Sequence, residues 1–410
     1  MIREFGLLTP VVLAALACQA QTRLGLREAV DSALRSRASL KAEQERVFAA
    51  EGVRKQAALL PNPEFQFLNE NLRPGQTYTR DVDTLAMISQ PLDVLGKRKQ
   101  RIALAGDSVA RAQADYEMAR WRVIERVKLA YWNARGLQEI RDVLRSAGGS
   151  FQKIVDYHAA QLNVGAIAEQ DVLRVRLESE RLSINADLAA LDFARARGDL
   201  LREMGAKEFT GYVLTEPLDE NIQVEPLGIE QVLARRVEIK AARAALEQAR
   251  ANAKLQDVSA RPDLNVTYGY KRTQLPDTVT GVNTAIASIR ITLPFTDKNQ
   301  GNRMAAAAEV RRQEDLLAAA EAEVRADYYS ALQEYEMRRT EFLTALQPLR
   351  EHAATISQIA SAAYAEGAVD LLRLLDAERA RLDAELAWTR GLADYRQSIV
   401  KLEAAEGVNQ

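Results

Sequence analysis

An internal duplication, with a period of about 200 residues, constrains this chain more than any other feature. Matching segments keep one order along both halves, which chance similarity would not produce; they pair Leu24-Gly25-Leu26 with Leu227-Gly228-Ile229, Gln90-Pro91-Leu92 with Leu293-Pro294-Phe295, and Val164-Gly165-Ala166 with Glu366-Gly367-Ala368. The chain is therefore two copies of one structural unit. We expect a first repeat over 21–206, a connector over 207–226 with a short strand near Tyr212, and a second repeat over 227–410.

The N-terminal segment has the pattern of an export signal. Arg3 precedes a short apolar stretch, and cleavage after Ala17 or after Ala20 would satisfy the small-residue rule. We expect residues 1–20 to be a cleaved signal peptide, with a buried first helix as the alternative. Cys18 follows an Ala-Leu-Ala sequence that resembles an imperfect bacterial lipobox, so lipidation of Cys18 is a further alternative.

Composition excludes several classes of function. The 410 residues carry 55 basic and 57 acidic side chains, and this net charge of −2 gives no support to nucleic-acid binding. A single cysteine and only two histidines exclude a disulfide framework, a cysteine-based zinc site and a histidine-rich metal centre. We expect His158 and His352 to be surface or packing residues. The sequence has no nucleotide-binding loop and no catalytic triad, so we expect neither enzymatic activity nor a cofactor.

Four segments have the alternating pattern of amphipathic strands, at about 64–72, 83–90, 264–272 and 284–293. Each is roughly nine or ten residues long, which suits a tilted strand that crosses a hydrocarbon layer. No later segment has the ~18 consecutive apolar residues that a membrane-spanning helix needs.

Four strands are too few to form a membrane barrel alone. Strands in lipid must close into a barrel to satisfy their edges, and bacterial barrels have about eight strands or more. We therefore expect the chain to oligomerise, and a trimer would supply twelve strands around an aqueous bore. The alternative is a pair of small hairpins that cap a helical bundle in solution.

Long helices dominate the rest of each repeat. Residues 97–162 contain no proline and carry apolar residues at steps of three, four or seven, which favours coiled-coil-like packing. We expect Gly148-Gly149 to interrupt this helix and Pro348 to kink its counterpart. Both helices then turn back at a glycine, which predicts helical hairpins over 97–205 and 300–405.

The first repeat also begins with a helix, predicted as one unbroken segment over 26–60 that ends at Pro61. Combined with the strands and hairpins, this helix gives the predicted fold class. The protein is expected to be mostly α, with a duplicated unit, long helical hairpins and a β-barrel contribution of four strands.

The order of these elements resembles the TolC-like outer membrane factor family. The run Gln90-Pro91-Leu92-Asp93-Val94-Leu95-Gly96-Lys97-Arg98-Lys99-Gln100-Arg101 is similar to that of its heavy-metal branch, of cobalt–zinc–cadmium type, and Leu59-Leu60-Pro61-Asn62-Pro63-Glu64 strengthens the match. The second repeat departs from the pattern at Thr296–Gly301, where the glycine comes late. The resemblance implies a homotrimer with a twelve-stranded barrel in outer-membrane lipid and a long periplasmic α-barrel. It also implies docking onto a periplasmic adaptor and an inner-membrane pump, commonly of the resistance-nodulation-division type.

The resemblance assigns candidate functional residues to the two hairpin turns, which form the periplasmic tip in this family. The residues expected to contact the adaptor are Val164, Gly165, Ala166, Glu366, Gly367 and Ala368. Both glycines also have a purely structural interpretation, because a helix reversal favours positive φ.

The resemblance also indicates a gate. Asp376 matches a family position whose carboxylates ring the closed pore, and three such carboxylates in a narrow bore would attract cations. Arg373 lies at helical spacing from Asp370 and Asp376 and is expected to pair with one of them and hold the tip shut. Asp171 is the weaker candidate in the first repeat. The alternative is that these residues belong to a solvated helix surface.

These features, with what the resemblance implies, predict a passive exit duct in the bacterial outer membrane, with a large periplasmic portion. An inner-membrane partner would supply the energy, and heavy-metal cations are the expected cargo. Drug efflux and type I protein secretion remain alternatives within the same class. A soluble periplasmic helical scaffold is the alternative from another class.

Overall fold

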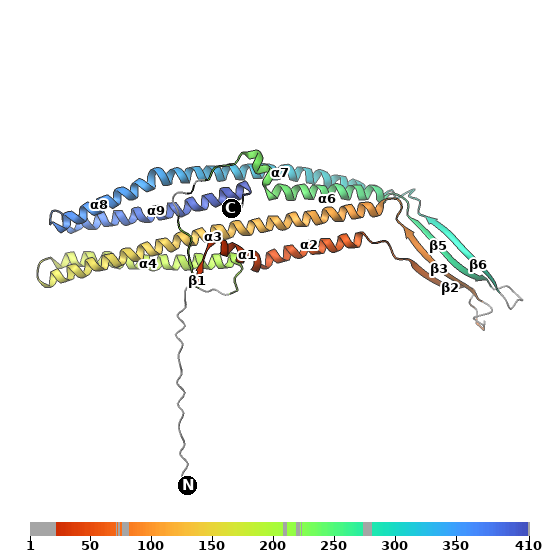
Figure 1. Cartoon of the computed structure of the whole chain (residues 1–410), viewed down its shortest axis with the longest axis horizontal. Coiled ribbons are helices and arrows are strands. Elements are labelled where there is room, and N and C mark those ends of the chain that lie inside the picture. Colours follow the sequence, from red (N-terminus) through yellow and green to blue (C-terminus); the bar gives the residue numbers. More distant parts are fainter. Residues whose placement is uncertain are drawn as a thin grey trace, which may run out of the picture.

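The protein is elongated, with a β-sheet at one end and two helical hairpin turns at the other (Figure 1). The computed structural model describes residues 22–70, 72, 74–75, 82–207, 211–218, 222, 224–273 and 281–408. The predicted signal peptide and Cys18 lie outside these residues. Within them, no helix combines the length and apolar character that crossing a bilayer requires.

From their first helices onward the two repeats follow the same order, except that one long helix of the first repeat corresponds to three consecutive helical segments in the second. The first repeat consists of β1 (Thr22–Leu24), α1 (Leu26–Ser36), α2 (Ala38–Ala57), β2 (Glu64–Glu70), β3 (Asp83–Leu92), α3 (Lys97–Asn163) and α4 (Glu169–Met204). The connector contains β4 (Tyr212–Leu214). The second repeat consists of α5 (Ile229–Arg235), α6 (Val237–Ser259), β5 (Leu264–Thr273), β6 (Val282–Ile291), α7 (Gln300–Glu341), the π-helical turn η1 (Phe342–Leu346), α8 (Gln347–Ala365) and α9 (Leu371–Glu406).

The four long strands form one antiparallel sheet in the order β2-β3-β5-β6, so β2 and β6 are its edges. The register places Phe65 opposite Ile88, Ile88 opposite Tyr268, and Tyr268 opposite Ala287. Residues opposite one another share a face of a sheet. One face is therefore apolar and aromatic, and it is exposed: Phe65 is 69% and Tyr268 67% accessible.

The helices form a layer in the order α4, α3, α9, α8 toward the tips (Figure 1). α3 packs against α2, α4, α6 and α9, so it connects the two repeats along most of its length. The approach of α3 to α9 requires Gly136, because a Cβ there would lie 2.5 Å from the Cβ of Ala393. Buried side chains of both hairpins share one apolar cluster, which includes Phe151, Leu182 and Leu375.

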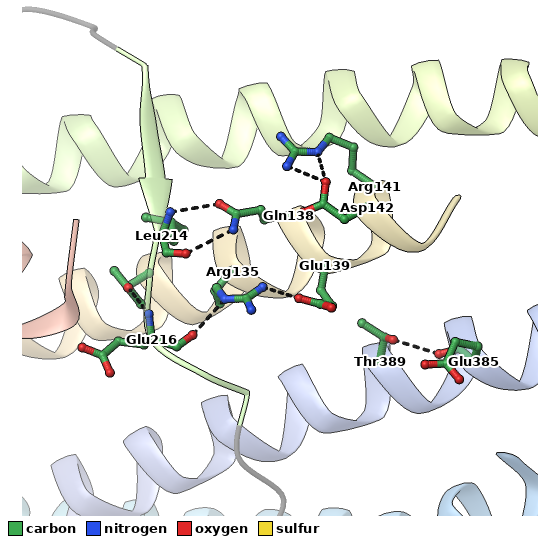
Figure 2. A network of polar contacts seen from close by, with 10 residues as sticks. Arg135, Gln138, Glu139, Arg141, Asp142, Leu214, Glu216, Glu385 and Thr389 are labelled. Atoms are coloured by element: carbon green, nitrogen blue, oxygen red, sulfur yellow. Dashed lines mark hydrogen bonds and ion pairs between the residues drawn. The ribbon is translucent and has the colours of Figure 1, made fainter. Parts of the chain in front are cut away.

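β1 and β4 form a two-stranded parallel sheet that holds the connector beside the middle of α3. The buried Tyr131 hydroxyl donates to the Leu24 carbonyl at 2.9 Å. The Gln138 side chain donates to the Leu214 carbonyl at 3.1 Å and accepts from the Leu214 amide at 3.0 Å (Figure 2). Arg135 donates to the Glu216 carbonyl one turn away. These bonds satisfy backbone groups of β1 and of the connector that are removed from water.

The predicted unbroken helix over 26–60 is wrong, because the chain is extended at Arg37 between α1 and α2. The Arg37 guanidinium donates to the Glu203 carbonyl and lies 2.8 Å from the Glu203 carboxylate, at the end of α4. The second repeat breaks at Arg236, which donates to the Ala405 carbonyl at 2.9 Å, at the end of α9. Carbonyls in the last turn of a helix have no helical partner, and these arginines supply one.

The predicted interruption at Gly148-Gly149 is also wrong, since both glycines lie inside the continuous helix α3. Two glycines cost roughly 2 kcal/mol of helix propensity, which packing of neighbours such as Phe151, 2% exposed, outweighs. The irregularity expected at Pro348 takes the form of the π-helical turn just before it. Pro348 has no N–H to donate to the Thr344 carbonyl, so regular α-helix cannot continue unchanged through this position.

Candidate functional site

The two hairpin turns have the same backbone conformation. Gly165 and Gly367 both lie in the left-handed region, with φ of 70° and 72°. In each turn the glycine and the next residue donate to carbonyls of the preceding helix: Ala166 bonds the Gln161 carbonyl at 2.9 Å, and Ala368 bonds that of Ala363 at 2.8 Å. This is the Schellman arrangement. A Cβ on either glycine would meet nothing within 4 Å, so both turns project into open space.

Three of the predicted gate residues, Asp370, Arg373 and Asp376, lie beside the second turn, and their partners differ from those expected. Asp370 caps α9, because its carboxylate accepts from the backbone N–H of Arg373 at 3.1 Å. Among the described residues, the Arg373 guanidinium has no ion pair with Asp370 or Asp376. Asp376 instead lies 3.7 Å from Arg379, one turn further along α9, and its side chain is 61% exposed.

Arg379 joins the two hairpins through a carboxylate that the sequence analysis did not single out. Its guanidinium lies 2.5 Å from Glu178 on α4, whose side chain is only 3% exposed. Glu178 also accepts from Arg181 at 2.6 Å. Burial alone would raise the pKa of Glu178, but hydrogen bonds and charge from Arg379 and Arg181 outweigh it, and the pKa is lowered. A buried carboxylate shared by two arginines therefore connects hairpin to hairpin and extends to Asp376.

A second polar contact between the hairpins involves His158, which is 1% exposed on α3. Its Nδ1 lies 2.8 Å from the Ile154 carbonyl, and its Nε2 lies 2.7 Å from the Tyr364 hydroxyl on α8. A carbonyl only accepts, so Nδ1 carries the hydrogen; in the neutral ring Nε2 then accepts from Tyr364. His158 is thus a packing residue, as one of the two expectations had it.

Asp171 lies near enough to Tyr364 to influence its charge state. Burial, with smaller contributions from the nearby Tyr157 and Asp171, raises the pKa of Tyr364. The hydroxyl therefore stays protonated and able to donate to His158. Asp171 lies in the first turn of α4, where a carboxylate stabilises the helix N-terminus.

The sheet at the opposite end of the molecule has a polar face as well as an apolar one. Ser89 on β3 donates to Asn265 at 2.7 Å and lies 3.1 Å from the Thr267 hydroxyl, both on β5. Gly269 is on the same face, where a Cβ would come within 2.6 Å of the Ala86 carbonyl oxygen. A sheet with one apolar face and one hydrogen-bonded polar face can separate lipid from water.

Ligating residues for a resident metal ion are not clustered in the part of the chain that the structure describes. No group of three or more His, Cys, Asp or Glu side chains there is close enough to hold an ion.

Comparison with known proteins decides the family. A model of the family described as outer membrane efflux protein matches residues 29–206 and 228–408, which is most of both repeats. The chain belongs to the outer membrane efflux protein family. The predicted relationship to TolC-like outer membrane factors is thereby confirmed.

Individual relatives extend over nearly the whole chain. The cobalt-zinc-cadmium resistance protein CzcC of Cupriavidus metallidurans is 26% identical over 404 residues, which cover 94% of this chain and 90% of the relative. The structure of CusC superposes with a TM-score of 0.75 at 18% identity, over 94% of this chain and 92% of that one. The open state of the MtrE outer membrane channel of Neisseria gonorrhoeae superposes with a TM-score of 0.73 at 23% identity, over 93% and 89%.

Membership of the outer membrane efflux protein family confirms the predicted function and location. The protein is an outer-membrane channel component of an efflux system, with a large periplasmic portion, and it acts as a passive exit duct. The predicted fold class, helical hairpins plus a four-stranded barrel contribution, is confirmed as well. Channels of this family are trimers that work with a periplasmic adaptor and an inner-membrane pump, and the family is one of ducts rather than of enzymes.

Proposed function

We propose that this duct exports heavy-metal cations of the cobalt, zinc and cadmium class, delivered by an adaptor and a pump of the resistance-nodulation-division type. The observation that carries the proposal is the similarity to the cobalt-zinc-cadmium resistance protein, which extends over 94% of the chain. The exposed carboxylates at the tip suit cationic cargo, because acidic rings favour cations over anions.

A deletion strain tests the cargo. We expect loss of the gene to increase sensitivity to cobalt, zinc and cadmium salts, and to leave sensitivity to hydrophobic drugs unchanged. Complementation with the wild-type chain should restore metal resistance. Drug sensitivity without metal sensitivity, or loss of a secreted protein alone, would refute the metal assignment in favour of the other two cargoes.

The hairpin tip is the proposed gate, and the residues assigned to it are Asp171, Asp370, Arg373 and Asp376. Asp376 is exposed and its partner Arg379 reaches Glu178 on the other hairpin, so separation of the hairpins must break that contact. Val164, Gly165 and Ala166, with Glu366, Gly367 and Ala368, are the proposed adaptor contacts, because both turns project from the molecule.

Conductance in planar bilayers tests the gate. Arg379→Ala removes the guanidinium shared by Glu178 and Asp376, and we expect a higher conductance from a tip that opens more often. Arg390→Ala, which removes an exposed arginine from the same helix, serves as the control. Equal conductance of both variants and the wild type would count against the gate.

The proposed homotrimer has a candidate contact between protomers. Figure 1 shows α4 and α8 on opposite sides of the helical layer. Each carries an exposed apolar stripe at helical spacing. The stripes consist of Leu173, Leu177, Ile184, Leu188 and Leu191 on α4 and of Leu349, Ile356 and Ile359 on α8. Packing of α4 against α8 of the next protomer would bury both stripes.

Disulfide cross-linking tests this contact. Leu177 and Ile356 lie about equally far from their hairpin turns, so a Leu177→Cys/Ile356→Cys double variant should give covalent trimers under mild oxidation. Each single variant should remain monomeric in denaturing gels. Intramolecular products alone would contradict the arrangement.

A further inference from the structure

All four connections between long strands and helices lie at one end of the sheet, where β2 and β5 begin and β3 and β6 end (Figure 1). Large apolar side chains are exposed in three of these connections, outside the sheet itself. They are Leu59, Leu60, Val94, Leu95, Leu293 and Phe295, with exposed fractions between 37% and 78%. We refer to these six residues as the junction collar.

The junction collar continues the apolar face of the sheet. Val94 follows Leu92 at the two-residue spacing that keeps side chains on one face, and Leu293 follows Ile291 in the same way. The Thr292 amide still donates to the Asp263 carbonyl at 3.0 Å, so the sheet's hydrogen bonding extends one residue past β6. The surface that meets lipid in an outer-membrane channel therefore extends into the strand-to-helix connections.

Basic residues border the junction collar, and most of them have structural partners. Lys97 lies 2.7 Å from Asp263, and Arg101 lies 2.9 Å from Asp93. Lys99 and Lys298 are unlike Lys97 and Arg101, because both are exposed and neither has an ion pair among the described residues. Lys99 follows Val94 and Leu95 by a few positions, and Lys298 follows Phe295 by a few positions. Apolar side chains with a lysine a few residues away match the boundary between acyl chains and headgroups.

We propose that the junction collar binds anionic glycerophospholipids of the periplasmic leaflet. Its apolar side chains would contact the upper acyl chains, and Lys99 and Lys298 would contact the phosphodiester. Two observations favour lipid over a protein partner. The collar is continuous with the lipid-facing side of the sheet, and the neighbouring Lys99 and Lys298, which have no ion pair among the described residues, complement a phosphodiester. The inference does not depend on which cargo the duct exports.

Lipid selectivity of the full-length trimer tests the charge component. The trimer is placed in nanodiscs of equal parts phosphatidylglycerol and phosphatidylcholine, and bound lipids are counted by native mass spectrometry. Lys99→Gln and Lys298→Gln should each weaken phosphatidylglycerol binding about fivefold. The exposed lysines Lys153 and Lys240, which lie on the helices away from the junctions, provide the matched control pair. Equal enrichment in the test and control variants would overturn the proposal.

Fluorescence quenching tests the apolar component and separates lipid from other ligands. In Phe295→Trp, bromine atoms near the headgroup end of the acyl chains should quench the added indole more than bromines near the chain terminus. Inorganic phosphate should not displace phosphatidylglycerol. Displacement by phosphate would indicate an ion site, and absence of quenching together with protection by the adaptor would indicate a protein surface; either result would overturn the proposal. Heat-modifiable migration verifies that each variant remains a folded trimer.

Discussion

The two repeats are alike at the breaks and ends of their helices, and they differ in the interior of their long helices. In each repeat an arginine at a helix break, Arg37 or Arg236, donates to the last carbonyls of the hairpin's returning helix. Between these points, α3 is regular throughout, whereas its counterpart is divided by a π-helical turn. The comparison indicates that helix termini, which carry unsatisfied backbone groups, tolerate less change than helix interiors, where packing can absorb an irregularity.

The largest expected difference between the repeats concerns these two arginines. Arg236 is 8% exposed and also lies 2.8 Å from Glu238, whereas Arg37 is 17% exposed. Arg236→Ala should therefore destabilise the trimer by about 3 kcal/mol and Arg37→Ala by about 2 kcal/mol, from lost hydrogen bonds to charged groups. Thermal unfolding of the detergent-solubilised trimer measures both values. Arg195→Ala removes an arginine whose side chain is 69% exposed in its ion pair with Asp192, and it should change stability by less than ~0.5 kcal/mol. A larger loss there than at Arg236 would contradict the comparison.

Glycines of α3 provide the next test, because their surroundings differ. Gly136→Ala would place a methyl group against Ala393 and should cost about 2 kcal/mol through overpacking. Gly148→Ala meets nothing within 4 Å and should stabilise the helix by roughly 0.5–1 kcal/mol. We expect the two variants to shift the thermal unfolding midpoint in opposite directions, down for Gly136→Ala and up for Gly148→Ala. The same sign for both variants would show that packing is not what distinguishes the two positions.

The contact between hairpins should make stability depend on pH. The pKa of Glu178 is lowered from 4.5, so its stabilising contribution is complete above about pH 4.5 and is lost as the pH falls through the lowered value. Glu178→Gln should reduce the difference in thermal midpoint between neutral and strongly acidic solution. Glu180→Gln, at an exposed position two residues away, is the control. An unchanged pH dependence in Glu178→Gln would exclude this carboxylate as a source of it.

The smallest expected effect is local. Pro348 has no N–H to give the Thr344 carbonyl its α-helical hydrogen bond, so amides around the π-helical turn should exchange hydrogen faster than those around Gly148 in α3. Hydrogen–deuterium exchange with peptide-level detection measures the difference. Slower exchange at the turn would mean that its buried contacts, such as Phe342 stacked on Tyr395 at 5.8 Å, compensate for the missing bond.

Local sequence patterns predicted the strands and the hairpin turns. The strands expected at about 264–272 and 284–293 are found at Leu264–Thr273 and Val282–Ile291, because period-two alternation and strand length are properties of adjacent residues. The observed ends of these strands differ from the predicted ends by up to two residues. Such differences are expected, because strand ends fray and depend on the hydrogen-bond criterion. The roles of the tip residues remain predictions.

Contacts between distant residues could not be predicted from those patterns. His158 and Tyr364 are 206 positions apart, and Glu178 and Arg379 are 201 apart. Each lies on a long helix among many similar polar residues, so nothing in its immediate neighbourhood distinguishes it from solvated surface. The offset, however, is close to the repeat period. One signal could have identified these contacts. It is a pair of polar residues about one repeat period apart, on helices that pack together.

The bonds between Gln138 and Leu214 have a consequence for the small sheet. β4 pairs with β1 along one edge, and the primary amide of Gln138 occupies both hydrogen-bonding positions of Leu214, which another strand would otherwise use. One side chain on a helix thereby imitates a peptide unit of a third strand. The backbone groups of Leu214 are therefore not available to pair with a strand of another chain.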